Sequence, residues 1–256
     1  MKKFFAIASL LALTLSACAE KEQEGEQQGE GRVTISLEAS AEVVDTRAQI
    51  SCQTPAADDF ALTIERVGGE PFTADYESVA AFNADSYLKY GEYTAKVVHG
   101  DVADEGYNKP TFAGEADFAV AARKHTDVAI TATIANAIVK VEATEAFKNY
   151  FVGGYTLTLR TAQGSEFDVT AQDELLFIAP ADFTISGSAT KQPSQSGTEG
   201  VVVTLPEYRP SEVKAQTLYT VKFDVEDAGR AQLTISLNDN LQESYDIEQE
   251  LNDYAK

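Results

Sequence analysis

Four residues of this chain have a thiol or imidazole side chain, the groups that most often serve as zinc ligands and as a strong nucleophile or general base. They are the two cysteines, Cys18 and Cys52, and the two histidines, His99 and His125. These four residues do not have the spacing of the usual zinc ligand patterns. The chain also has no Gly-x-Ser-x-Gly elbow and no glycine-rich phosphate loop. We therefore predict no catalytic residue, no metal and no cofactor, and we interpret both histidines as surface residues.

The chain is rich in carboxylates, and their number alone does not exclude a glycosidase-like pair. Two acidic turns, 101–105 and 238–240, could hold calcium, but neither has the spacing of an EF-hand loop. We interpret both as solvated turns. Cys52 is interpreted as a small, half-buried residue at a strand end, with a reactive or intermolecularly paired thiol as the alternative. Together these observations predict that the protein is not an enzyme.

Aromatic side chains offer a second kind of binding chemistry, because sugars often stack on aromatic faces. The chain has no tryptophan. Four tyrosines could supply a weak platform around the loops of the first half: Tyr76, Tyr87, Tyr90 and Tyr107. The alternative is that they are amphipathic strand and corner residues whose hydroxyl groups contact water.

The charge of the chain is strongly negative, with 20 basic and 41 acidic residues and a net charge of −21. Nucleic-acid binding needs a basic face, which this composition does not provide, so we exclude it. The overall charge favours solubility and would repel a bare anionic membrane. An acidic patch for a basic or metal ligand is the alternative to a merely solvated surface.

The amino terminus has the features of an export signal. Lys2 and Lys3 precede an apolar run over 4–15, and twelve helical residues span roughly 18 Å, too short to cross a bilayer. The following residues, Leu-Ser-Ala-Cys at 15–18, resemble a bacterial lipobox. The resemblance implies that residues 1–17 are a signal peptide, that signal peptidase II cuts between Ala17 and Cys18, and that Cys18 carries the lipid. An ordinary secretory signal is the alternative.

Residues 18–31 are predicted to form a disordered, lipidated acidic tether, because 19–31 contain no aromatic or β-branched residue. Glu20-Lys21-Glu22 resembles the acidic export tag of surface lipoproteins from Bacteroidota. This resemblance implies a lipid-anchored protein of the outer membrane that faces the cell exterior. A periplasmic orientation is the alternative.

The rest of the chain alternates apolar and polar residues with a period of two, which predicts strands with one solvated face. Clear runs are 32–37, 60–67, 92–97, 155–159, 219–225 and 232–237. We predict an all-β protein with two tandem antiparallel β-sandwich domains of the immunoglobulin or transthyretin type, over 32–134 and 135–256. A short helix over 144–151, capped by Thr144, is expected in the second.

Several motifs occur together in an order that resembles a known family. They are Thr-Arg-Ala at 46–48, Gly-Glu-Tyr-Thr at 91–94, Lys-Pro-Thr-Phe-Ala-Gly at 109–114, and 134–141 followed by 147–151. In this order they look like a domain-of-unknown-function family of surface lipoproteins from Bacteroidota. More distantly, the amino-terminal part is similar to the fimbrillins, whose subunits are tandem transthyretin-like sandwiches.

Two functional hypotheses follow. The first is a non-catalytic envelope lipoprotein, held to the membrane by the lipid on Cys18, that binds or displays a glycan or protein through its sandwich loops. The alternative, implied by the similarity to fimbrillins, is a pilus or accessory subunit. In that family an arginine-specific protease removes the first strand and a neighbour's strand replaces it. Arg47 is the natural cleavage site here. The oligomeric state stays open.

Overall fold

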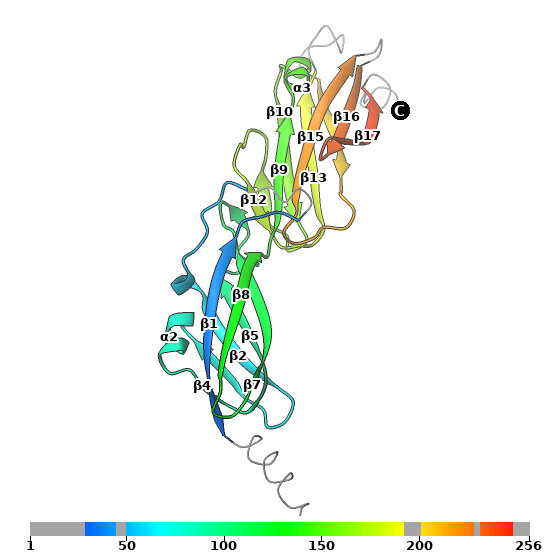
Figure 1. Cartoon of the computed structure of the whole chain (residues 1–256). Helices are drawn as coiled ribbons and strands as arrows, with labels where there is room; N and C mark the ends of the chain where they lie inside the picture. The colour runs from blue at the N-terminus through cyan, green and yellow to red at the C-terminus, as the bar shows by residue number, and fades with distance from the viewer. Residues whose placement is uncertain (1–28, 45–49, 192–200, 228–230, 248–256) are drawn as a thin grey trace, which may run out of the picture.

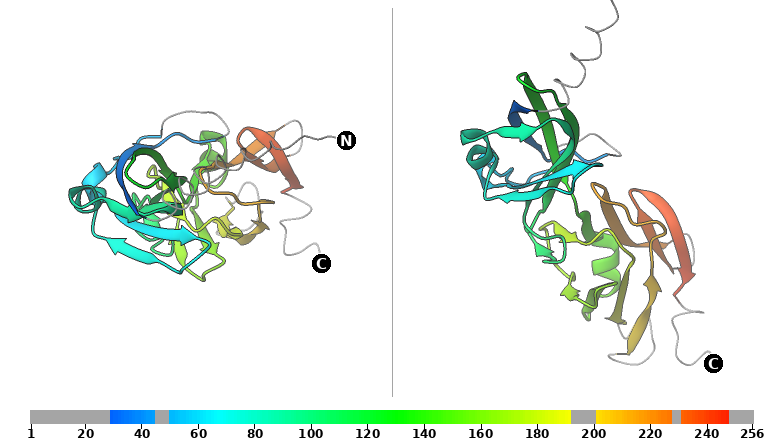
Figure 2. Two further views of the ribbon diagram at one scale, coloured as in Figure 1. Left: turned by 60° about the horizontal axis from the view of Figure 1, so that its bottom comes forward. Right: turned by 90° about the horizontal axis from the view of Figure 1, so that it is seen from below.

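The computed structural model describes residues 29–44, 50–191, 201–227 and 231–247. Figure 1 shows two β-rich halves placed end to end, and the right-hand view in Figure 2 shows the same division. The predicted all-β fold is confirmed. The residues predicted for lipidation and processing, Ala17, Cys18 and Arg47, lie outside the described residues.

The first half is built from seven strands in one sheet, in the order β3-β2-β5-β7-β8-β1-β4. Its strands are β1 (Glu30–Ser40), β2 (Ala61–Val67), β3 (Thr73–Tyr76), β4 (Tyr87–Lys89), β5 (Gly91–His99), β7 (Phe112–Val120) and β8 (His125–Ile134). β7 pairs with β5 over its full length but with β8 at only two positions, Phe112 and Ala113. The sheet therefore folds over at this corner into two layers.

The first core fills the space between these layers. Alternate residues of the strands point into it, including Val33 and Ile35 of β1 and Leu62 and Ile64 of β2. A 3-10 helix, η1 (Ala57–Asp59), and the helix α2 (Val79–Ala84) lie beside the strands. α2 is capped by Ser78, whose hydroxyl accepts a hydrogen bond from the backbone of Ala81. The helix thereby covers an open part of the core.

The second half contains two sheets and the second core. Its strands are β9 (Ala137–Ala143), β10 (Tyr155–Thr161), β11 (Glu166–Asp168), β12 (Leu176–Ile178), β13 (Phe183–Thr190), β14 (Val202–Tyr208), β15 (Leu218–Asp227), β16 (Ala231–Leu237) and β17 (Asn240–Asp246). One sheet has the order β11-β10-β13-β14, and the other has the order β17-β16-β15-β9-β12-β6, in which β6 is Gly106–Tyr107. The predicted helix is confirmed as α3 (Glu145–Tyr150), with the Thr144 hydroxyl accepting from the Phe147 backbone.

Two strand pairings differ from the antiparallel sandwiches that we predicted. β1 runs parallel to β8 over nine residue pairs, and β9 runs parallel to β15. Strand alternation reports which face is buried but does not report strand direction, so the sequence pattern could not show this. β1 also begins at Glu30, two residues earlier than predicted, because Glu30 and Gly31 pair with β4.

A short strand from the first half belongs to a sheet of the second half. Directly after the acidic turn 101–105 comes β6 (Gly106–Tyr107), which pairs with β12 at the sheet edge. Conversely, Ile138 and Phe177 from the second half are fully buried in the first core. The two halves are therefore joined by shared sheet and shared core as well as by the chain at residues 135–136.

Among the described residues, no helix combines the length and the apolar character needed to span a bilayer.

Candidate functional site

The junction between the halves is fixed by buried polar groups from both sides. The Glu105 carboxylate is 9% exposed and accepts hydrogen bonds from the Thr161 hydroxyl at 2.8 Å and the Ala179 backbone at 3.0 Å. The hydroxyl of Tyr107 donates to the carbonyl of Asp168 at 2.7 Å. Glu105 stands in the predicted acidic turn, so this turn is a structural contact and not wholly solvated. No set of three potential metal-ligating side chains gathers within the described residues.

A second buried contact at the junction involves Asn136, which is fully buried. Its side-chain oxygen accepts from the backbone N–H of Thr111 at 2.6 Å, and its side-chain nitrogen finds no hydrogen-bond partner in the part of the chain that the structure describes. The backbone carbonyl of Asn136 accepts from Gln216, whose side chain in turn donates to the carbonyl of Glu42 at 2.9 Å. These bonds connect three segments that are far apart in the sequence, so the geometry of the loops at the junction is set by both halves.

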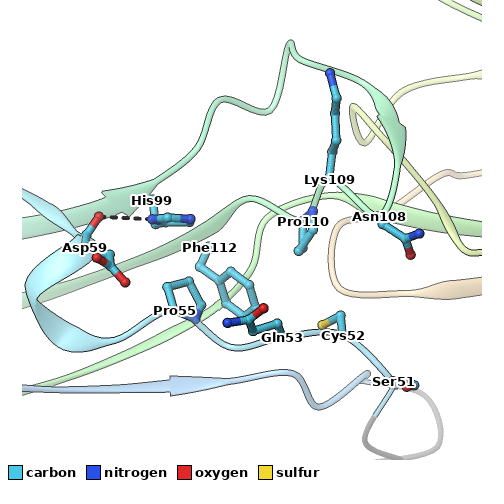
Figure 3. Close-up of a pocket in the computed structure, with 10 residues that line it drawn as sticks. All are labelled: Ser51, Cys52, Gln53, Pro55, Asp59, His99, Asn108, Lys109, Pro110 and Phe112. Atoms are coloured by element: carbon cyan, nitrogen blue, oxygen red, sulfur yellow. Dashed lines mark hydrogen bonds between the residues drawn. The ribbon is translucent and has the colours of Figure 1, made fainter.

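Next to this junction lies a hollow of about 570 Å³, which we call the waist pocket (Figure 3). It is lined by Ser51, Cys52, Gln53, Pro55, Asp59, His99, Asn108, Lys109, Pro110 and Phe112. The lining comes from two segments of the first half, 51–59 and 108–112, and from His99 at the end of β5. The backbone N–H of Asn108 donates to the carbonyl of Leu175 at 3.1 Å, so the second half holds one wall of the pocket in place.

His99 and Cys52 both line the waist pocket, but they do not form a nucleophile–base pair. The Nδ1 of His99 lies 3.0 Å from the carbonyl of Asp59 (Figure 3). A carbonyl can only accept, so Nδ1 carries the proton. Burial raises the pKa of the Cys52 thiol, which keeps it protonated and weakly nucleophilic. Figure 3 shows Cys52 and His99 apart, with Gln53 and Phe112 drawn between them.

His125 has neighbours that superficially match a catalytic triad. Its Nε2 lies 2.9 Å from the Thr34 hydroxyl and 3.4 Å from a carboxylate oxygen of Asp127. In a triad the acid and the hydroxyl contact different ring nitrogens, whereas here both contact the same one. All three residues are also on the surface strands β1 and β8. The arrangement is therefore a surface hydrogen-bond cluster.

The four tyrosines of the predicted platform lie in two places. Tyr76, Tyr87 and Tyr90 lie at the end of the first half from which the amino-terminal segment leaves, whereas Tyr107 lies at the junction. At the first place Tyr76 and Tyr87 line a second hollow of about 580 Å³ together with Phe72 and Tyr93. Phe72 packs edge-on against Tyr93, and the Arg66 guanidinium lies 5.9 Å from the centre of the Tyr93 ring.

Sequence reasoning missed the two residues that fix the junction, Glu105 and Asn136. Glu105 was noted only as part of an acidic turn, and the two-residue strand beside it is too short to give a periodic pattern. Asn136 begins the second half in the sequence, but nothing in its neighbours indicates that its side chain is buried.

The fold and the pocket define a two-sandwich β-protein with a polar hollow where its halves meet. The chain belongs to the family described as Domain of unknown function (DUF4493), whose model matches residues 29–253. This confirms the resemblance to a domain-of-unknown-function family. No curated protein sequence matches the chain.

Several solved structures are similar to the chain at low sequence identity. The fimbrial anchor protein Mfa2 from Porphyromonas gingivalis has a TM-score of 0.43 and 10% identity, over 84% of this chain and 100% of that chain. A proposed adhesin from Bacteroides ovatus has a TM-score of 0.43 and 10% identity, over 84% and 95%. A proposed polysaccharide-binding protein (DUF1812) from Bacteroides thetaiotaomicron has a TM-score of 0.40 and 12% identity, over 87% and 100%. The family assignment rests on the sequence match alone.

Proposed function

We propose that this chain is a non-catalytic lipoprotein of the outer membrane that faces the cell exterior and binds a glycan or protein ligand in the waist pocket. The observation that carries the proposal is the pocket itself. It lies beside the junction between the halves, and amide, imidazole and carboxylate side chains line a hollow of about 570 Å³. Pockets of this kind and position commonly hold small ligands or chain segments.

The lack of an activated nucleophile supports a binding role. In the waist pocket the Cys52 thiol is held in its protonated form by burial, and the His99 ring is hydrogen-bonded to a backbone carbonyl. The lipid anchor is supported by the lipobox at 15–18 and by the position of β1, which starts at Glu30 and includes the last two residues of the predicted tether. A buried first strand connects the tether firmly to the folded part.

Ligand binding can be tested by filling the pocket. We expect the mature protein to retain a component from a panel of glycans or from an envelope extract. Gln53→Trp should lower that affinity on the order of tenfold, because the indole would occupy the hollow. Thr54→Trp is the matched control, since Thr54 is the next exposed residue and does not line the pocket. No retained component, or equal binding by both variants, would contradict a ligand site here.

The anchor is tested by the intact mass and amino-terminal sequence of the protein extracted from its native membranes. A chain that begins at an acylated Cys18 supports the lipoprotein. Digestion of intact cells with a protease added from outside then tests the exterior orientation, because a chain facing the periplasm would stay intact.

One observation favours the alternative of a strand-exchanged subunit. β1 lies between β8 and β4, with Val33 and Ile35 almost fully buried. Its removal after cleavage at Arg47 would leave a groove that a neighbour's strand could fill by β-augmentation. The strand β17 already pairs with β16 at a sheet edge of its own chain, so it is not free to fill the groove of a neighbour. A mature chain that begins at Ala48 would support this alternative and refute the tethered protein with an intact first strand.

A further inference from the structure

The end of the first half next to the tether has a surface unlike the rest of the protein. Strand register brings four segments together there, because Val67 pairs with Glu92, Gly91 pairs with Val120, and Glu30 pairs with Lys89. We call this surface the tether end and define it by residues 29–32, 66–72, 87–92 and 120–124. Figure 1 shows it at the bottom of the molecule, where β1 begins.

Exposed aromatic side chains concentrate at the tether end. Among the described residues, the aromatic side chains with large exposed areas are Phe72, Tyr87 and Tyr90, which are 38%, 58% and 37% exposed. Val67 of the same surface is 52% exposed. A cluster of exposed apolar groups on a soluble domain marks a contact surface more often than chance exposure.

The charge of the tether end is opposite to that of the remaining chain. Its segments contain five bases and three acids, a net charge of +2, whereas the rest of the chain has 15 bases against 38 acids, or −23. Four of these bases are exposed and form no ion pair with any described residue: Arg32, Lys89, Arg123 and Lys124. The fifth, Arg66, donates to the carbonyl of Tyr90 at 2.6 Å.

Exposed tyrosines surrounded by unpaired cations suit the interface of a lipid bilayer. The amphipathic rings of tyrosines sit at headgroup level, and lysine and arginine are attracted by anionic headgroups. We propose that the tether end docks on the phospholipid headgroups of the membrane that holds the lipid on Cys18. The proposal rests on the lipid anchor proposed above, and it deepens that function by assigning a second membrane contact.

The length of the tether permits this contact. Ten residues, 19–28, lie between Cys18 and Gly29. At 3.3–3.6 Å per residue they span at most about 36 Å when extended, and less in other conformations. The tether is therefore short enough to let the tether end reach the headgroups. Because the rest of the chain is strongly negative, an anionic surface would repel it and orient the protein with its second half and waist pocket pointing outward.

The docking can be measured with single tryptophan reporters, because the chain contains no tryptophan. Acylated protein, verified by mass, is inserted into vesicles of phosphatidylethanolamine and brominated phosphatidylglycerol. We expect the emission of Tyr90→Trp to shift to shorter wavelength and to be quenched by the bromine. Val152→Trp, placed beside α3 at the far end where Val152 is 66% exposed, should show neither change.

Charge reversal tests the role of the cations. Arg123→Glu with Lys124→Glu should reduce the quenching of Tyr90→Trp, and added salt should do the same by screening. Lys148→Glu with Lys214→Glu makes the same change of net charge on the second half and should leave the quenching unchanged. Equal effects of the two double variants would overturn the proposed contact, because total charge would then explain the result.

Other occupants of the surface give different outcomes. If acylated protein stays on the vesicles and both reporters remain unquenched, docking is wrong while the anchor stands. If the emission of Tyr90→Trp responds to soluble oligosaccharides or to deletion of residues 20–28 and not to vesicles, the surface binds a glycan or the acidic tether, and docking is also wrong. A mature mass without acyl chains on Cys18 refutes the anchor and the docking that depends on it.

Discussion

Glu105 of the first half accepts a hydrogen bond from the hydroxyl of Thr161 in the second half, at 2.8 Å. Its other carboxylate oxygen accepts from the backbone N–H of Ala179 at 3.0 Å. These bonds hold β6 beside β12 and thereby fix the loop that forms one wall of the waist pocket. The junction between the halves therefore supports one wall of the proposed binding site and is not a passive linker.

Glu105→Ala should destabilise the protein by about 2 kcal/mol, because two donors of the second half lose a charged, buried acceptor. Urea unfolding followed by circular dichroism measures this change. Asp104→Ala is the control, since the Asp104 side chain is 67% exposed and pairs only with exposed Lys109. That variant should change stability by less than about 0.5 kcal/mol. Equal losses of unfolding free energy for the two variants would show that Glu105 does not stabilise the junction between the halves.

Ile35→Ala should cost about 2–5 kcal/mol, because Ile35 is 2% exposed in the first core and its truncation leaves a cavity. Glu38→Ala, three residues later on the same strand and exposed, should be close to neutral. The comparison measures how strongly β1 is held. If Ile35→Ala has no effect on unfolding, β1 contributes little to the stability of the fold. The loss of β1 after cleavage at Arg47 would then leave the rest of the fold stable.

The Cys52 thiol should react slowly in the folded protein. Burial raises its pKa, so near pH 8 the fraction of reactive thiolate is smaller than in an exposed cysteine. Alkylation by iodoacetamide, followed by mass spectrometry, should be slower for the folded chain than for the same chain in denaturant. A folded rate equal to or above the unfolded rate would instead support the alternative of a reactive thiol.

Tyr208→Phe should be neutral or slightly stabilising near neutral pH. The Tyr208 hydroxyl is buried and has no hydrogen-bond partner among the described residues, so its removal relieves a desolvation cost. Burial, with a smaller effect from the negative charge of Glu243, also raises the pKa of Tyr208. The protonated form is therefore favoured by folding. This contribution is complete below the unfolded pKa of about 10 and is lost as pH rises through the folded pKa.

The measurement for Tyr208 compares urea midpoints at about pH 7 and about pH 11. Tyr208→Phe should lose less stability between these conditions than the unmodified protein. Tyr87→Phe is the matched control, because Tyr87 is 58% exposed and should not alter the pH dependence. A large loss of stability for Tyr208→Phe near pH 7 would mean that the hydroxyl makes a hydrogen bond that stabilises the fold.

Alternation in the sequence correctly placed six runs in strands, and the cap at Thr144 correctly indicated the short helix. The run at 232–237 became β16 (Ala231–Leu237), and Thr144 caps α3 as expected. These features depend on neighbours within a few residues, since a strand shows its buried face at every second position and a cap acts over one turn. The parallel pairing of β1 with β8 depends on residues about ninety positions apart, and no local pattern reports it.

The sequence by itself therefore determined the fold class, the acidic character and the absence of familiar catalytic motifs, because composition and local periodicity carry this information. It also predicts the lipid on Cys18, which lies outside the described residues. Only the tertiary structure decided that Glu105 and Asn136 connect the two halves. It also decided that Cys52 and His99 line one pocket without pairing. It further decided that the exposed aromatic residues and the unpaired cations meet at the tether end. Each of these results depends on strand register and chain crossover, which bring together residues that are distant in the sequence.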